Sequence, residues 1–238
     1  MQEVSGNRWC RSAIAAIVAL GVFLGLGPLV TLLGIEGLVA RQVALKGLMI
    51  LVALLAWLAL RQPWSAMGWT RFGWTRRCWR WLGLSCLAMA AAAVAMILND
   101  LRHPLASQLS FLPLMAIVWF LSSFAEEVYV RGAMQSWCQL GLDGRTLRPT
   151  SAPIVASALL FAAMHVPLIW KGGGPLGGGI IVAATLFVGW GCAVVRARTG
   201  SVWAPFVVHA LANMAAVPGG IVGAIAYRIA FGTFPTMQ

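Results

Sequence analysis

Residues 125–132 read Ala-Glu-Glu-Val-Tyr-Val-Arg-Gly, within a long apolar run that begins near Pro113. Two of the six acidic residues of the chain, Glu126 and Glu127, stand side by side in this stretch. An ionisable group at mid-membrane depth costs roughly 2.5–3.5 kcal/mol on insertion scales, so such groups usually face a protein interior and take part in function. We therefore expect this pair to mark the functional site.

The composition is that of an integral membrane protein. The 238 residues are 61% hydrophobic and only 10% charged, with a mean hydropathy of +0.86, whereas soluble domains carry about 25% charged residues. A spanning helix needs about 20 largely apolar residues, so the chain has room for seven or eight spans and no extramembrane domain. The five cysteines are odd in number and form no C-x-x-C pair, which excludes a disulfide framework and a zinc knuckle.

The net charge of +11 raises the question of nucleic acid as a partner. The basic residues are dispersed between apolar runs and are not gathered on a soluble module, so we exclude nucleic-acid binding. Arginines and tryptophans alternate most densely in residues 61–80, between two expected spans. Arginine and tryptophan at that position are typical of a belt at the lipid headgroups, so membrane lipid is an expected partner.

Apolar runs predict an all-α, polytopic membrane helix bundle of about eight transmembrane helices. Residues 1–110 would hold helices one to three, and residues 111–238 a catalytic helical core with a C-terminal helix. Gly172–Gly179 would form a flexible connector, and we find no internal repeat of the kind seen in many transporters. The expected spans are 13–33, 44–60, 81–98, 111–137, 151–169, 180–195, 202–217 and 219–234.

Basic residues between the spans predict the orientation. If both termini are cytoplasmic, the cytoplasmic segments hold most of the lysines and arginines, as the positive-inside rule requires, and the Glu126–Glu127 end of the fourth span lies nearer the cytoplasm. The cytoplasmic set is then Arg8, Arg11, Arg61, Arg71, Arg76, Arg77, Arg80, Arg145, Arg148, Arg196 and Arg198, against Arg41, Lys46, Arg102 and Lys171 in loops on the other side.

Three pairs of polar or aromatic residues recur at a spacing of four within the spans. Glu127 and Arg131 have the acid on the N-terminal side, the better orientation for an ion pair on a helix. Phe161 and His165 share one helix face in the fifth span, and His209 and Asn213 share a face in the seventh. These residues predict one polar constellation inside the membrane.

The chemistry of this constellation follows from its residue types. Arg131 can hold Glu127 ionised, which leaves Glu126 without a dedicated cation. Glu126 can then act as a general base when deprotonated and as a general acid afterwards, sharing a water with His165. His209 and Asn213 can offer hydrogen-bond donors to a developing oxyanion, the stabilisation that matters most in acyl transfer.

Each feature also has a purely structural explanation. A buried Glu127–Arg131 pair can serve only to clamp helices together, each histidine can be a satisfied core residue, and Phe161 can be packing beside a ring. Since every embedded polar group is costly, a structural role for all of Glu126, His165, His209 and Asn213 together is much less favoured.

The order Glu-Glu-x-x-x-Arg, Phe-x-x-x-His and His-x-x-x-Asn over residues 113–217 resembles the CPBP family. This family groups CAAX prenyl proteases of the Ras-converting type with bacteriocin-processing and related bacterial proteins. The residues before each histidine resemble the family too: Ala-Ser-Ala-Leu-Leu-Phe at 156–161 and Gly-Ser-Val-Trp-Ala-Pro at 200–205. Three motifs in order are far more specific than any one alone.

The resemblance implies a glutamate-type intramembrane endopeptidase with a helical, typically eight-span fold and no cofactor. It implies that Glu126 with His165 activates the attacking water and that His209 and Asn213 stabilise the oxyanion. Glu127 and Arg131 would support the site, with Phe161 beside it. Val130 departs from the family pattern, in which many members have Phe before the Arg, and this puts the wall of the substrate cleft in doubt.

The resemblance leaves the substrate and the oligomeric state open. Abundant Trp and Arg with few Lys favour a bacterial inner membrane, and a membrane-associated protein or peptide as substrate. One alternative fills the site with zinc, held by Glu126, His165 and His209, although no H-E-x-x-H motif is present. Another is a non-enzymatic membrane protein with an immunity, scaffold or transport role.

Overall fold

The computed structural model describes residues 3–101, 110–140, 147–170 and 174–235. These residues form helices and contain no strand, which confirms the predicted all-α membrane bundle. Six helical stretches in the described chain are long and apolar enough to cross a membrane. They are α1 (Glu3–Leu32), α2 (Leu38–Ala59), α4 (Arg76–Leu98), α8 (Ala152–Ala163) continued by η3 (Val166–Trp170), α9 (Gly174–Thr199) and α10 (Trp203–Phe231).

A further helical run covers 111–139 and carries the two adjacent glutamates. It consists of α5 (Phe111–Pro113), η1 (Leu114–Ser122), α6 (Ser123–Glu127), η2 (Val128–Gln135) and α7 (Ser136–Gln139). The segments η1 and η2 are wound as π-helix, a rare conformation that often occurs at functional sites. The glutamates therefore stand at the end of a short α-helical segment between two π-helical segments, in the middle of this run.

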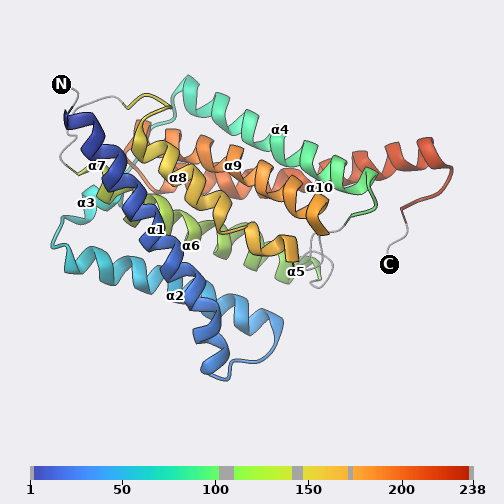
Figure 1. The fold of residues 1–238 in the computed structure, drawn as a ribbon. Coiled ribbons are helices and arrows are strands. Elements are labelled where there is room, and N and C mark those ends of the chain that lie inside the picture. Colours follow the sequence, from blue (N-terminus) through green and yellow to red (C-terminus); the bar gives the residue numbers. More distant parts are fainter. Residues whose placement is uncertain (1–2, 102–109, 141–146, 171–173, 236–238) are drawn as a thin grey trace.

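Helices α4, α8, α9 and α10 run roughly side by side between the end of the bundle where α1 begins and the end where α10 leaves it, and α1 crosses them obliquely (Figure 1). The short helix α3 (Trp64–Met67) lies between α2 and α4. Buried side chains of α1, α2, η2 and α8 form one core around Trp57 and Phe161. A second core joins α4, α9 and α10 around Val195 and Val208.

Helix α10 corrects the prediction of two spans at 202–217 and 219–234, because 203–231 is one continuous helix that contains Pro218. Gly219, directly after Pro218, is a packing position: a Cβ there would lie 2.5 Å from the carbonyl oxygen of Ala90 in α4. Small residues allow such close approach between membrane helices. One helix fewer places the two ends of the described chain at opposite ends of the bundle (Figure 1). This contradicts the expectation that both termini are cytoplasmic, which rested on an even number of spans.

This contact predicts that Gly219→Ala destabilises the fold while Gly220→Ala does not. The added methyl group at Gly219 would collide with the backbone of Ala90, whereas nothing lies within 4 Å of a Cβ at Gly220. Overpacking of this kind typically costs about 1–3 kcal/mol. Unfolding of the two purified variants in detergent measures the difference, and equal stability would contradict the packing role of Gly219.

Two loop predictions are also wrong. The expected flexible connector Gly172–Gly179 is helical from Gly174 onward, and residues 171–173 lie outside the described part of the chain. Gly178 is a packing position, since its Cβ would lie 2.4 Å from a side-chain carbon of Ile169. The second span begins at Leu38, earlier than the expected start at residue 44, and Lys46, which was counted with the charges of the preceding loop, lies well inside the helix.

Candidate active site

Both glutamates of the adjacent pair are buried, and they face different neighbours. Glu126 is 6% exposed and lines a cavity of about 870 Å³, whereas Glu127 is fully buried beside it. Both lie at the end of α6, where the chain passes into the π-helical turns of η2. Successive residues on a helix point about 100° apart, so one carboxylate reaches the cavity while the other reaches the packed interior.

Glu127 is the centre of a buried hydrogen-bonded network. Arg131 Nη1 donates to Glu127 Oε1 over 3.0 Å, as their spacing of four predicts, and Arg131 Nη2 donates to the carbonyl oxygen of Gly189 over 2.7 Å. The same Glu127 oxygen lies 3.0 Å from His209 Nδ1. The network thus ties η2 to α9 and to α10, the helix that carries His209.

Glu126 has a dedicated cation, which corrects the expectation that it would have none. Lys46 Nζ of α2 donates to Glu126 Oε1 over 2.6 Å, and the lysine is only 7% exposed. A buried ammonium next to a buried carboxylate favours the ionised form of both. Sequence reasoning missed Lys46 because it was counted with the loop charges that set the orientation, although it falls within the expected second span. A single lysine inside an apolar helix was the available signal.

The second oxygen of Glu126 faces His209. The distance from Glu126 Oε2 to His209 Nε2 is 3.8 Å, which is longer than a hydrogen bond. Because the carboxylate of Glu127 accepts at His209 Nδ1, the Nδ1 nitrogen carries a proton. The orientation of the ring is thereby fixed, with Nε2 turned toward Glu126 and the cavity.

His165 presents its other nitrogen to the same cavity. Its Nδ1 lies 2.8 Å from the carbonyl oxygen of Phe161. A carbonyl oxygen only accepts, so Nδ1 donates, and in the neutral ring Nε2 keeps a free lone pair. The rings of His165 and His209 lie 5.0 Å and 5.1 Å from that of Phe161, and the Arg131 guanidinium lies 4.5 Å from its centre. Phe161 is therefore a spacer that contacts three members of the site.

Asn213 lines the cavity one helical turn after His209 on α10, as their spacing predicts. Its Nδ2 donates to Ser123 Oγ over 3.1 Å. An amide nitrogen has two hydrogens, so this contact orients the side chain and leaves one N–H for another acceptor. Sequence reasoning did not identify Ser123 as a partner, since a serine in an apolar run gives no distinct signal.

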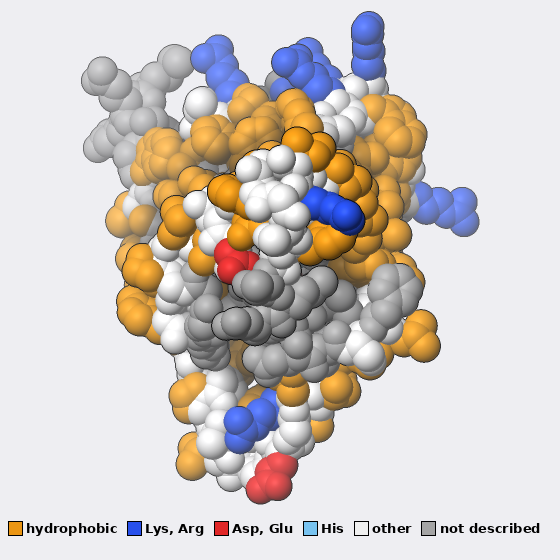
Figure 2. Space-filling model, turned by 90° about the vertical axis from the view of Figure 1, so that its right-hand side faces the viewer, with side chains coloured by type: hydrophobic (Ala, Val, Ile, Leu, Met, Phe, Trp, Pro, Cys, Tyr) orange, Lys and Arg blue, Asp and Glu red, His pale blue; other side chains and the backbone are white. Residues whose placement is uncertain are grey.

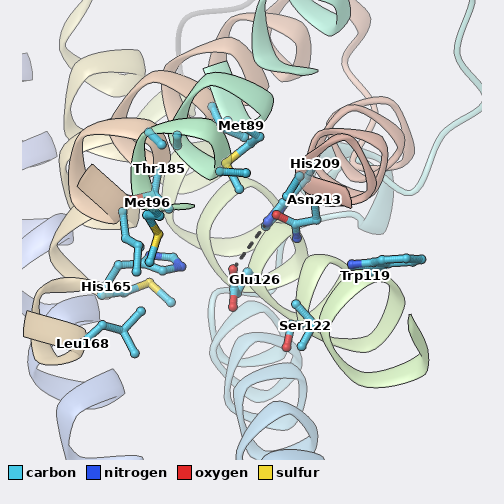
Figure 3. A pocket seen from close by; sticks show the side chains of 18 of the residues that line it. Met89, Met96, Trp119, Ser122, Glu126, His165, Leu168, Thr185, His209 and Asn213 are labelled. Atoms are coloured by element: carbon cyan, nitrogen blue, oxygen red, sulfur yellow. Dashed lines mark ion pairs between the residues drawn. The ribbon is translucent and has the colours of Figure 1, made fainter. Parts of the chain in front are cut away.

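The cavity brings the predicted residues together from three separate helical runs (Figure 3). Glu126 stands between His209 and Asn213 on one side and His165 on the other, and the rest of the wall is largely apolar (Figure 3). Met89 and Met96 of α4, Leu168 of η3 and Ile221 of α10 contribute to that wall. Such a cavity with a few convergent polar groups is the usual form of a ligand site.

Fold and site together define a polytopic helical membrane protein with a carboxylate–histidine site inside the bundle. The family model described as "Rce1-like: Type II CAAX prenyl endopeptidase Rce1-like" matches residues 108–215, which confirms the resemblance to the CPBP family. The match indicates an intramembrane protease of the CAAX type. No curated protein and no solved structure matches the chain.

The zinc alternative fits the observed residues poorly. Within the described residues, no group of three His, Cys, Asp or Glu side chains is placed to hold a metal ion. More directly, the ammonium of Lys46 lies against the Glu126 oxygen that a metal ion would have to contact, and two cations at one carboxylate oxygen would repel each other. We therefore derive no step through a metal.

Proposed function

We propose that the protein is an endopeptidase that hydrolyses a peptide bond within, or next to, a membrane-anchored segment of a protein or peptide. The observation that carries this proposal is the meeting of Glu126, His165, His209 and Asn213 around one apolar cavity. Their roles, the substrate and the placement of the protein in a bacterial inner membrane are proposals that rest on this geometry, the composition and the family.

In the proposed first step, a water between Glu126 and His165 attacks the scissile carbonyl carbon. Glu126 accepts one proton of the water as general base, with the lone pair of His165 Nε2 orienting that water. A carbon–oxygen bond forms, and the carbonyl π electrons move onto the oxygen. Lys46 stays paired with Glu126 Oε1, so Oε2 is the oxygen that takes the proton.

The developing oxyanion would be held from α10. The free N–H of Asn213 Nδ2 supplies one donor, and His209 Nε2 supplies a second when that nitrogen is protonated. Glu127 accepts at His209 Nδ1 and balances the charge of such an imidazolium. Collapse of the intermediate breaks the carbon–nitrogen bond, and the proton held by Glu126 passes to the leaving amine.

The runner-up is a non-catalytic immunity, scaffold or transport role, in which the buried polar groups only hold the helices together. Several contacts of the network are of this kind, including Arg131 to the Gly189 carbonyl and Asn213 to Ser123. What favours catalysis is that Glu126 and His165 both line the cavity, and that Glu126 keeps its second oxygen outside the ion pair with Lys46.

Terminal-peptide proteomics on host membranes tests the proposal. Strains that express the wild type or Glu126→Gln at equal levels are compared, and we expect a small set of protein termini to be absent from the variant. These termini would identify the substrate and the cut site together. If no terminus changes and His165→Ala is equally silent, the non-catalytic explanation is favoured, and metal analysis of the purified protein tests the zinc alternative.

A further inference from the structure

The cavity occupies only one half of the bundle along its axis. In every helical run but α10, the lining residues lie mainly in the half that is farther from the end of the bundle where α1 begins. These runs are α1, α2, α4, η1–α6, α8–η3 and α9. In α10 the lining starts at His209 and continues outward. Asp100, Leu101 and Pro235, which follow the last turns of α4 and α10, also belong to the lining. The cavity therefore extends from the catalytic groups to the end where α10 leaves the bundle.

The other half of the bundle is closed by packed side chains. Arg131 and Gln135 are fully buried one and two turns beyond the glutamates, and Gln135 Nε2 donates to the carbonyl oxygen of Ala193 over 2.9 Å. A turn further, Arg196 Nη2 donates to Ser136 Oγ over 2.7 Å and to the carbonyl oxygen of Ala66. Among the described residues, these layers join η2 and α7 to α9 and separate Glu126 from that end.

Charge distinguishes the two ends of the bundle. The closed end carries the arginine-rich set Arg8, Arg11, Arg61, Arg71, Arg76, Arg77, Arg80, Arg148 and Arg198, which we call the arginine-rich end. The end reached by the cavity has Arg41 and Arg228 together with Glu36 and Asp100, and both red and blue side chains occur on it (Figure 2). Basic residues favour the cytoplasmic side of a membrane, so the arginine-rich end is the cytoplasmic one.

We infer that the active site opens toward the extracytoplasmic side and takes substrate segments that reach it from that side. The substrate class is then the extracytoplasmic juxtamembrane part of a membrane-anchored protein or peptide, and not a tail in the cytosol. This inference rests on the proposed function for its substrate, while the direction of opening rests on the cavity, the packed layers and the charges alone. The apolar wall suits the last residues of a membrane anchor, which enter next to the peptide bond that is cut.

Cysteine labelling tests the direction of opening without any need for activity. Gln42→Cys and Leu168→Cys each place a thiol in the cavity wall, and the exposed native Cys10 near the start of α1 reports the arginine-rich end in the same molecule. A membrane-impermeant maleimide is applied to spheroplasts and to inside-out vesicles, and labelled peptides are quantified by mass spectrometry. We expect the cavity thiols to react in spheroplasts and Cys10 in inside-out vesicles.

A matched control distinguishes a thiol inside the cavity from a thiol at the same depth on the lipid-facing surface of the bundle. Val43 is next to Gln42 but 47% exposed on the outer surface of the bundle, so Val43→Cys should react much more slowly because its thiol faces lipid. Cavity thiols that react only in inside-out vesicles, or that react from neither side, would overturn the inferred opening. If labelling is as expected but no terminus depends on Glu126, the proposed protease function fails and the opening stands. If termini depend on Glu126 but lie in cytosolic segments, only the inferred access fails.

Discussion

Glu126→Gln is expected to lower the rate of peptide cleavage by the purified protein about 10²–10⁴-fold, the usual contribution of general acid–base catalysis. Glutamine has nearly the shape of glutamate but cannot accept the proton of the attacking water. The substrate for this assay is a peptide that spans the cut site found by terminal-peptide proteomics. Cleavage at the wild-type rate would contradict the role of Glu126 as the base.

The ion pair with Lys46 complicates this substitution, and a double variant resolves it. Glu126→Gln leaves a buried ammonium without its carboxylate 2.6 Å away, and breaking a buried pair by removing one partner costs about 3–5 kcal/mol. We expect Glu126→Gln with Lys46→Met to regain most of that stability and to regain no activity. Recovery of cleavage in the double variant would show that lost stability, and not lost chemistry, explains the single variant.

The local parts of the site could be predicted from the sequence because they depend on spacing within one helix. Glu127 and Arg131, and likewise His209 and Asn213, are four residues apart, and a helix places such residues on one face whatever surrounds it. The family resemblance indicated that the three motifs, in this order along the chain, belong to one site. In the structure Arg131 does pair with Glu127, and His209 and Asn213 do line the same cavity.

Long-range contacts could not be predicted in this way. The contact between Lys46 and Glu126 joins residues 80 positions apart, and no local period encodes it. The glycines show the same limit: Gly172–Gly179 was interpreted as a flexible connector, although the chain is helical from Gly174 onward and Gly178 packs closely against Ile169. Where a glycine faces another helix, as Gly219 faces Ala90, only the assembled bundle distinguishes the two uses.

Arg131→Met is expected to destabilise the protein by about 3–5 kcal/mol, the loss typical when one partner of a buried ion pair is removed. Both members of the pair are fully buried. The substitution takes the cation from Glu127, and it takes the hydrogen-bond donor from the carbonyl oxygen of Gly189 in α9. Unfolding in detergent, followed by circular dichroism, measures the change in the free energy of unfolding.

Gln135→Met is the matched control, because it removes a comparable contact that carries no charge. Gln135 is also fully buried in η2, one turn beyond Arg131, and it also donates to a carbonyl oxygen of α9, that of Ala193. Removing a neutral hydrogen bond of this kind costs about 0.5–1.5 kcal/mol, and more when an acceptor is left buried without a donor. The two variants therefore isolate the part of the loss that depends on charge. Equal destabilisation would mean that Arg131 stabilises the bundle only through its hydrogen bond to α9. The hydrogen bond from His209 would then be enough to stabilise the buried carboxylate of Glu127.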